Sequence, residues 1–187
     1  MKKIILLISI LLLLTSLLNS AELTIPVSQT AVICSGFDSN YGRLLFKFDL
    51  PKELDSAFID YSEIIFKAEP EPSYSNAKLI VIGAFPLSRD WSVDYVFWSA
   101  PWLNPGGDYI DSIYCSALLL KSDDYEIGLD ITQIVRLWGE NSLFNYGLIL
   151  MSLGSECPFK FSHHSSLEKN ANAEVKIYYT PPDRKLR

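Results

Sequence analysis

The sequence predicts an all-β protein, a jelly-roll β-sandwich of about nine strands with one short helix. Short apolar segments recur along the chain, separated by clusters of Gly, Pro, Asn, Asp and Ser that favour turns. A single segment has the apolar period of an α-helix. Many strands with one helix do not fit an α/β enzyme, which needs a crossover helix between its parallel strands.

The clearest strand covers residues 43–50, and Pro51 ends it. Because its apolar and polar side chains alternate, one face is expected in the core and the other in solvent. The apolar face carries Leu44, Phe46, Phe48 and Leu50, and the other face carries Arg43, Lys47 and Asp49.

Eight more segments have strand character. The segment at 78–85 is apolar on both faces and is expected inside a sheet, whereas 69–76 is rich in turn residues. The expected strands are 23–34, 64–68, 78–85, 113–120, 125–129, 146–153, 159–163 and 174–179.

The short helix is expected directly after the strand at 125–129. Asp130 would cap its free N–H groups, Gln133 would be the reciprocal partner of a capping box, and Gly139 would end it in the left-handed conformation. The apolar stripe that packs on the sheet is formed by Ile131, Ile134, Val135 and Trp138.

The N-terminus has the three parts of a secretory signal peptide. Lys2 and Lys3 precede an apolar segment at 4–18, and Ser20 and Ala21 supply the small residues of a cleavage site. A retained membrane anchor is the alternative, but a bilayer core needs about 20 apolar residues. Cleavage is expected after Ala21, with the bond after Ser20 as the second choice.

Cleavage defines the expected domains and location. Residues 1–21 form the signal peptide, 22–181 one β-sandwich domain, and 182–187 a disordered tail. No cysteine follows the cleavage site, so we expect no lipid anchor there. The product would be secreted to the extracellular space, the cell surface or a periplasm, without a membrane anchor.

The charge balance argues against a nucleic-acid partner. The chain has 16 Lys and Arg against 22 Asp and Glu, and the loss of Lys2 and Lys3 leaves 14 against 22, a formal charge of −8. Such a surface repels phosphate, and no basic stripe in the sequence offsets it.

Cys34, Cys115 and Cys157 allow one disulfide in three pairings with one thiol left over, or three buried thiols. Their spacing fits no zinc site. Thiol catalysis is not expected, because the histidines, His163 and His164, are neighbours in an expected strand and point to opposite faces.

Five segments occur in an order that resembles the DNRLRE domain, over residues 31–181. The resemblance implies a secreted jelly-roll β-sandwich of bacterial and archaeal surface proteins, similar to carbohydrate-binding modules that include binders of acidic polysaccharide. The match is divergent, because the hexapeptide that names the family is absent and Val93 stands where the family has an acidic residue. The segments are GRLLFKFDLP (42–51), WSVDYVFWSAP (91–101), GLDITQIVRLW (128–138), NYGLIL (145–150) and 173–181.

Residues 91–109 form the densest aromatic segment. Aromatic faces on a rigid sandwich suit sugar rings, which stack on a flat apolar surface while polar groups orient their hydroxyls. Trp102 and Tyr109 are therefore the candidate carbohydrate-binding residues, with burial as the alternative for each. Trp91 and Trp98 are expected in the core, as the resemblance implies. The segment contains Trp91, Tyr95, Phe97, Trp98, Trp102 and Tyr109.

The densest acidic cluster has two interpretations. Oxygen-rich loops can hold a structural calcium ion, but the spacing matches no EF-hand, and solvated turn residues explain the same pattern. No cofactor is otherwise expected. The cluster consists of Asp108, Asp111, Asp123, Asp124 and Glu126.

No catalytic motif is present: G-x-S-x-G, H-E-x-x-H and a phosphate-binding glycine loop are all absent. Nothing marks Asp94 and Asp130 as a glycosidase pair, since Asp130 is expected to cap the helix. We expect a non-enzymatic module that binds a polysaccharide or cell-surface glycan, or mediates adhesion. A self-associating structural subunit of a surface layer or appendage is the alternative, and a polysaccharide hydrolase or lyase is the third hypothesis.

Overall fold

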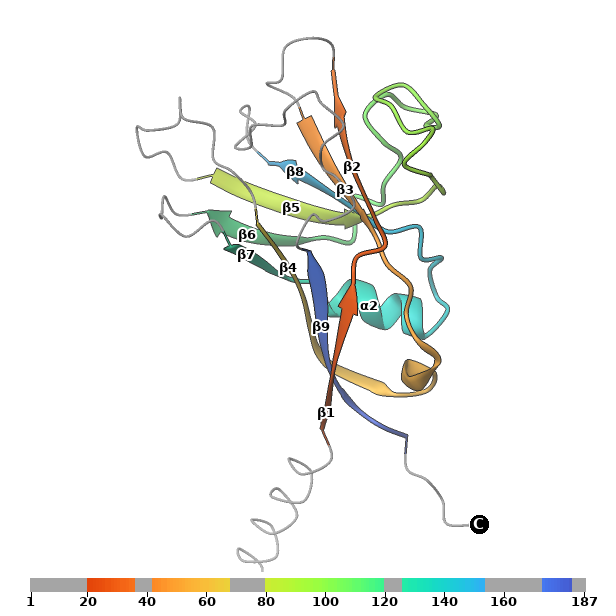
Figure 1. The fold of residues 1–187 in the computed structure, drawn as a ribbon, viewed down its shortest axis with the longest axis vertical. Helices are drawn as coiled ribbons and strands as arrows, with labels where there is room; N and C mark the ends of the chain where they lie inside the picture. Colours follow the sequence, from red (N-terminus) through yellow and green to blue (C-terminus); the bar gives the residue numbers. More distant parts are fainter. Residues whose placement is uncertain (1–19, 36–41, 68–79, 120–125, 154–172, 183–187) are drawn as a thin grey trace, which may run out of the picture.

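Two antiparallel sheets pack face to face, which confirms the predicted all-β sandwich (Figure 1). The computed structural model describes residues 20–35, 42–67, 80–119, 126–153 and 173–182. Sheet A has the order β1 (Ala21–Pro26), β9 (Glu174–Thr180), β4 (Phe58–Lys67) and β7 (Glu126–Asp130). Sheet B has the order β2 (Gln29–Cys34), β3 (Gly42–Lys47), β8 (Leu148–Ser152), β5 (Ile80–Pro86) and β6 (Cys115–Leu119).

The strand order is that of a jelly roll. The chain passes from β3 in sheet B to β4 in sheet A and back to β5 in sheet B, and it repeats this exchange from β6 to β8. The series β1-β9-β4-β7 and β3-β8-β5-β6 are the two four-stranded sheets of that fold, and β2 adds a fifth strand at the edge of sheet B. The prediction that the segment at 78–85 lies inside a sheet is also confirmed, because β5 pairs with both β6 and β8.

The prediction of one strand at 23–34 is wrong, because this segment forms two strands in different sheets. Pro26 ends β1, since proline has no N–H for the next ladder bond. The Val27 N–H then donates to the Ala173 carbonyl beside sheet A, and the Ser28 N–H donates to the Lys47 carbonyl on sheet B. The expected strand at 159–163 lies outside the described residues.

The inner faces of the sheets enclose the main core. Phe46 of β3 and Phe66 of β4 meet across it, with ring centroids 5.3 Å apart. Phe48 contacts Trp138 edge to face, with centroids 5.5 Å apart. Burial of a side chain of this size contributes about 1.5–3 kcal/mol, so these rings are a main reason why the two sheets stay together.

Helix α2 (Thr132–Gly139) lies beside β4 and closes one end of this core, near the short 3₁₀ turn η2 (Lys52–Leu54) (Figure 1). The N-cap position is occupied by Ile131 and not by Asp130 as predicted, but the Asp130 carboxylate still accepts from one free N–H of the first turn, that of Thr132, at 2.9 Å. The helix begins one residue later than predicted, so Gln133 is not in the capping-box position. Gly139 is the last helical residue, and Asn141 takes the left-handed conformation with φ 55°. The predicted stripe of Ile131, Ile134, Val135 and Trp138 is buried.

A second core lies on the outer face of sheet B. The segment between β5 and β6, residues 87–114, folds back over this face and is called the cap below (Figure 1). Leu45 of β3 is fully buried under it, so the outer face of β3 is not in solvent as the alternating pattern predicts. The second core is formed by Leu87, Trp91, Val96 and Trp102 of the cap with Ala31, Ile33, Leu45, Phe85 and Ile149.

Candidate functional site

Two basic side chains on the outer face of β3 fasten the cap to sheet B. Arg43 donates through Nη1 to the Gly106 carbonyl at 2.6 Å, and its guanidinium lies 5.1 Å from the centre of the Trp98 ring. Lys47 donates through Nζ to the Asp90 carboxylate at 2.5 Å and to the Trp91 carbonyl at 3.1 Å. The polar face of β3 therefore positions the cap.

The three tryptophans of the cap are all engaged in contacts with other parts of the protein. Trp91 is buried, as predicted, and its Nε1 donates to the Tyr146 carbonyl at 2.9 Å. Trp98 is half-buried under Arg43. Trp102, a candidate for carbohydrate stacking, is only 7% exposed, and its Nε1 donates to the Phe97 carbonyl at 2.9 Å. Because little of its ring reaches solvent, the structure places Trp102 in the second core and not on a ligand-binding face.

Tyr109, the other sequence candidate, lies where a ligand can reach it. Its ring is half-buried and contacts both Phe85, with centroids 5.1 Å apart, and the Arg43 guanidinium, 5.6 Å from the ring centre. Leu87 and Tyr109 also form an isolated β-bridge. The side chain is therefore fixed before any ligand arrives, which lowers the entropy cost of binding.

Asp108 organises the loop beside Tyr109. Its buried carboxylate accepts from the Leu103 N–H at 2.7 Å, the Asn104 N–H at 3.0 Å and the Asn104 side-chain amide at 3.2 Å. Arg89 Nε donates to it at 3.1 Å. Burial alone would raise the pKa of Asp108, but these hydrogen bonds outweigh burial and hold the pKa below its usual value.

A groove of about 440 Å³, called the cap groove below, opens where these residues meet. This volume is within the range of ligand sites. Asp108 forms part of its wall, while Arg89 keeps guanidinium N–H groups that have no partner within the described part of the chain. The residues that line the groove are Ser88, Arg89, Leu103, Asn104, Gly107, Asp108, Tyr109 and Asp111.

The sequence prediction missed Ser88, Arg89 and Asn104 as groove residues. Ser88 precedes the aromatic segment at 91–109, and Arg89 becomes part of the groove only through Asp108, 19 residues later. The sequence around Asn104 gives a weak indication of a turn, because Asn104 stands before Pro105 and two glycines. Both glycines, Gly106 and Gly107, have positive φ in the structure. Such a sequence favours a sharp turn, and a turn brings its flanking side chains together.

The acidic residues are not collected into a metal site in the described part of the chain. Within those residues no three His, Cys, Asp or Glu side chains are close enough to hold a metal ion. Asp108 is occupied by protein donors, and Asp111 is exposed in the cap groove. Asp123 and Asp124, as well as His163 and His164, lie outside the described residues.

The described cysteines are on opposite edges of sheet B. Cys34 is on β2 and Cys115 on β6, four strand spacings or about 19 Å apart, whereas a disulfide needs Cα atoms within about 7 Å. That pairing does not form. Burial raises the pKa of the free Cys115 thiol to about 11, which suits a packing role and not a nucleophile. Cys157 lies outside the described residues.

No protein-family model matches this chain, and no curated protein does either. Among the residues described, no helix is both long enough and apolar enough to cross a membrane.

Proposed function

We propose that the protein is a secreted, non-catalytic β-sandwich module that recognises a polysaccharide or cell-surface glycan through the cap groove. The observation that carries the proposal is the position of Tyr109 in one groove with an arginine, an amide, a hydroxyl and a carboxylate. The signal peptide expected at the N-terminus and the ordered resemblance to the DNRLRE domain support the same function. Fold alone does not, because sandwiches of this kind have many functions.

The groove has the chemistry that a sugar needs. Arg89 offers donors, Asp111 offers acceptors, and Ser88 offers both, which matches hydroxyl groups that donate and accept hydrogen bonds. Tyr109 supplies an apolar edge and a phenolic hydroxyl. All four side chains belong to a cap that is fixed on a sheet, so the site is largely formed before binding.

The carboxylates of the groove support binding without hydrolysis. A glycosidase needs a carboxylic acid with a raised pKa as its proton donor. Asp108 is the opposite case, since its pKa is lowered and both of its oxygens accept protein hydrogen bonds. Asp111 is exposed, so nothing in the groove keeps it away from water.

A structural subunit is the second candidate, and three exposed apolar side chains of the cap favour it. Tyr95 is 75% exposed, Phe97 63% and Leu103 77%. Large apolar side chains that stay exposed are candidates for protein contacts. Under this alternative the cap would meet a second copy of the chain, and the purified protein would self-associate in the absence of glycan.

A glycan-array screen of the chain from Glu22 tests the proposal. The groove variant Ser88→Ala/Asp111→Ala changes two exposed residues and should keep the fold, yet lose about tenfold or more of the signal. The control Tyr95→Ala changes an exposed cap residue outside the groove and should bind like the parent.

Other outcomes of the screen would refute the proposal. If the parent binds no glycan and self-associates on sizing chromatography, the structural subunit replaces the binding module. Release of reducing ends from a bound polysaccharide would restore the hydrolase or lyase hypothesis.

A further inference from the structure

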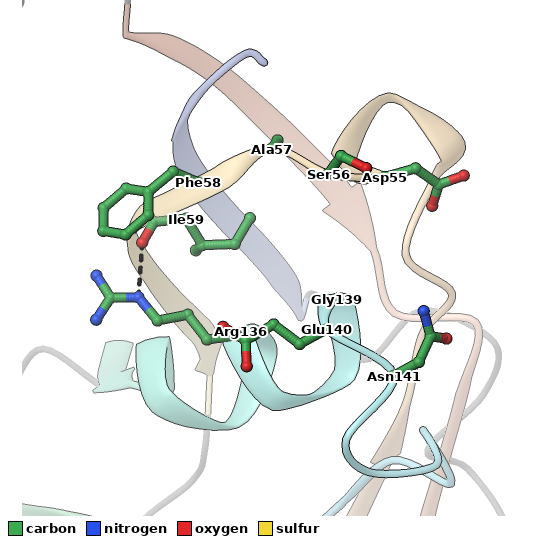
Figure 2. A pocket seen from close by; sticks show the side chains of 9 residues that line it. All are labelled: Asp55, Ser56, Ala57, Phe58, Ile59, Arg136, Gly139, Glu140 and Asn141. Carbon is green, nitrogen blue, oxygen red and sulfur yellow. Dashed lines mark hydrogen bonds between the residues drawn. The ribbon is translucent and has the colours of Figure 1, made fainter.

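A second groove, of about 660 Å³, lies between the start of β4 and the end of α2, and is called the end groove below (Figure 2). Asp55 and Ser56 come from the segment that leads into β4, and Phe58 is the first residue of that strand. Arg136, Glu140 and Asn141 come from the C-terminal end of the helix and the turn that follows. None of these six side chains lines the cap groove.

Phe58 is a fixed and exposed aromatic surface. Its side chain is 62% exposed, and the Arg136 guanidinium lies 5.0 Å from the ring centre. Arg136 is itself held by the backbone, because Nε donates to the Ile59 carbonyl at 2.7 Å and Nη2 to the Asp60 carbonyl at 3.1 Å. Figure 2 shows the ring and the guanidinium together at one end of the groove. A large exposed ring that is supported in this way is available for stacking.

The other end of the groove is polar. Figure 2 places Asp55 and Asn141 there, across from each other, with Glu140 between Asn141 and Arg136. Asp55 and Glu140 are exposed carboxylates, and Ser56 and Asn141 add a hydroxyl and an amide. Asn141 has φ 55° and Ser56 has φ 64°, so both sit in turns that fix their direction. An apolar plate with hydrogen-bonding groups along its edge is the arrangement that a pyranose ring requires.

The charges decide which sugars fit. The groove carries two carboxylates, Asp55 and Glu140, and one guanidinium, Arg136, so its net charge is −1. The carboxylates accept hydrogen bonds from neutral hydroxyl groups, and the net charge disfavours the carboxylate of a uronic acid. The groove also faces the C-terminal end of α2, where the helix dipole is negative and disfavours anions. An ammonium group is disfavoured for another reason, because the Arg136 guanidinium already occupies the region beside the Phe58 ring.

From these contacts we propose that the end groove is a second glycan site, specific for neutral sugar residues, in which Phe58 stacks on the ring and Asp55 and Glu140 accept hydroxyl hydrogen bonds. The inference takes its ligand class from the proposed function but uses a different site. Two sites on one rigid sandwich also allow one chain to hold two segments of a polysaccharide, so avidity exceeds the affinity of either site.

Calorimetric titration with neutral hexasaccharides of glucose, mannose and xylose tests this inference. The parent chain should bind two molecules of at least one of them, and the cap-groove variant Ser88→Ala/Asp111→Ala should bind one. Phe58→Ala in that background should weaken the remaining binding about tenfold or more, because the stacking surface is lost. Phe144→Ala is the matched control, since Phe144 is 76% exposed and lines neither groove.

A second pair of probes tests the charge argument. The cap-groove variant Ser88→Ala/Asp111→Ala should bind mannohexaose in preference to hexamannuronate. Adding Asp55→Asn/Glu140→Gln to this variant should reduce that preference at low ionic strength. Both substitutions keep the size and a hydrogen-bonding oxygen of each side chain.

The outcomes separate the two sites. If the parent binds one hexasaccharide, and only the cap-groove variant loses it, the end-groove inference fails and the proposed function stands. If Phe58→Ala abolishes all binding and the cap-groove variant has no effect, the end groove is the site and the cap groove is not. Equal binding by Phe58→Ala and Phe144→Ala would refute the inference.

Discussion

At the scale of single residues, Asp108 gives the clearest link between charge and structure. Four donors from the cap converge on its carboxylate, and they keep its pKa below the usual value despite burial. A carboxyl group whose pKa is lower in the folded state stabilises that state above its unfolded pKa of about 3.9. This contribution is lost as the pH falls through the folded pKa.

Asp108→Asn should therefore lower the free energy of unfolding by about 1–3 kcal/mol at pH 7, because two N–H groups and a guanidinium lose a charged acceptor. The difference from the parent should shrink at pH 3, where the parent carboxylate also begins to protonate. Urea unfolding at both pH values measures it, with the exposed Asp111→Asn as control. A difference that stays constant from pH 7 to pH 3 would contradict this role.

At the scale of secondary structure elements, Gly147 fixes the entry to β8. It has φ +91°, and a Cβ there would clash with the Phe46 carbonyl oxygen and lie 3.2 Å from the Lys47 Cα. The Gly147 N–H donates to the Asn145 side-chain oxygen at 3.0 Å, and the Asn145 side-chain amide donates to the Phe48 carbonyl at 2.8 Å, so this backbone conformation is also held by hydrogen bonds. Glycine is thus required where β8 approaches β3.

Gly147→Ala should cost about 3 kcal/mol or more, because the substitution adds strain at positive φ to a clash with a sheet backbone. Gly139→Ala is the control: the new Cβ meets nothing within 4 Å, and alanine favours a helix by about 0.5–1 kcal/mol. Thermal melts of both variants give the comparison. Equal stability of Gly147→Ala and the parent would show that the turn tolerates a side chain.

The elements also show how far sequence reasoning extends. The helix stripe and the strand at 43–50 are local periodic patterns, and the burial of Phe46 and Trp138 confirms the faces that they predict. The predicted end of the strand at Pro51 is wrong, because β3 ends at Lys47. Leu45 and Trp102 depend on a cap that folds back over sheet B, and no local pattern indicates that contact. The end groove likewise joins Phe58 to Arg136, which are far apart in the sequence. Tyr109 was predictable as a candidate because its aromatic segment is dense, but its polar neighbours depend on the fold.

At the scale of the whole molecule, the jelly roll is a rigid frame for two separate grooves. Sheet B carries the cap groove through Arg43 and Lys47, and the far end of the sandwich carries the end groove through α2. The residues that are shown to line the two grooves all belong to the described part of the chain. Under the proposed function, the formal net charge of −6 would favour neutral glycans over acidic ones.

Amide chemical-shift mapping would show whether a glycan occupies the cap groove. The ¹⁵N-labelled chain from Glu22 would be titrated with the strongest glycan from the array. We predict that the amide signals of Ser88, Asn104 and Asp111 move with saturation, while the indole N–H of the buried Trp91 does not. Saturable binding that leaves all three cap-groove amides unshifted would contradict the account.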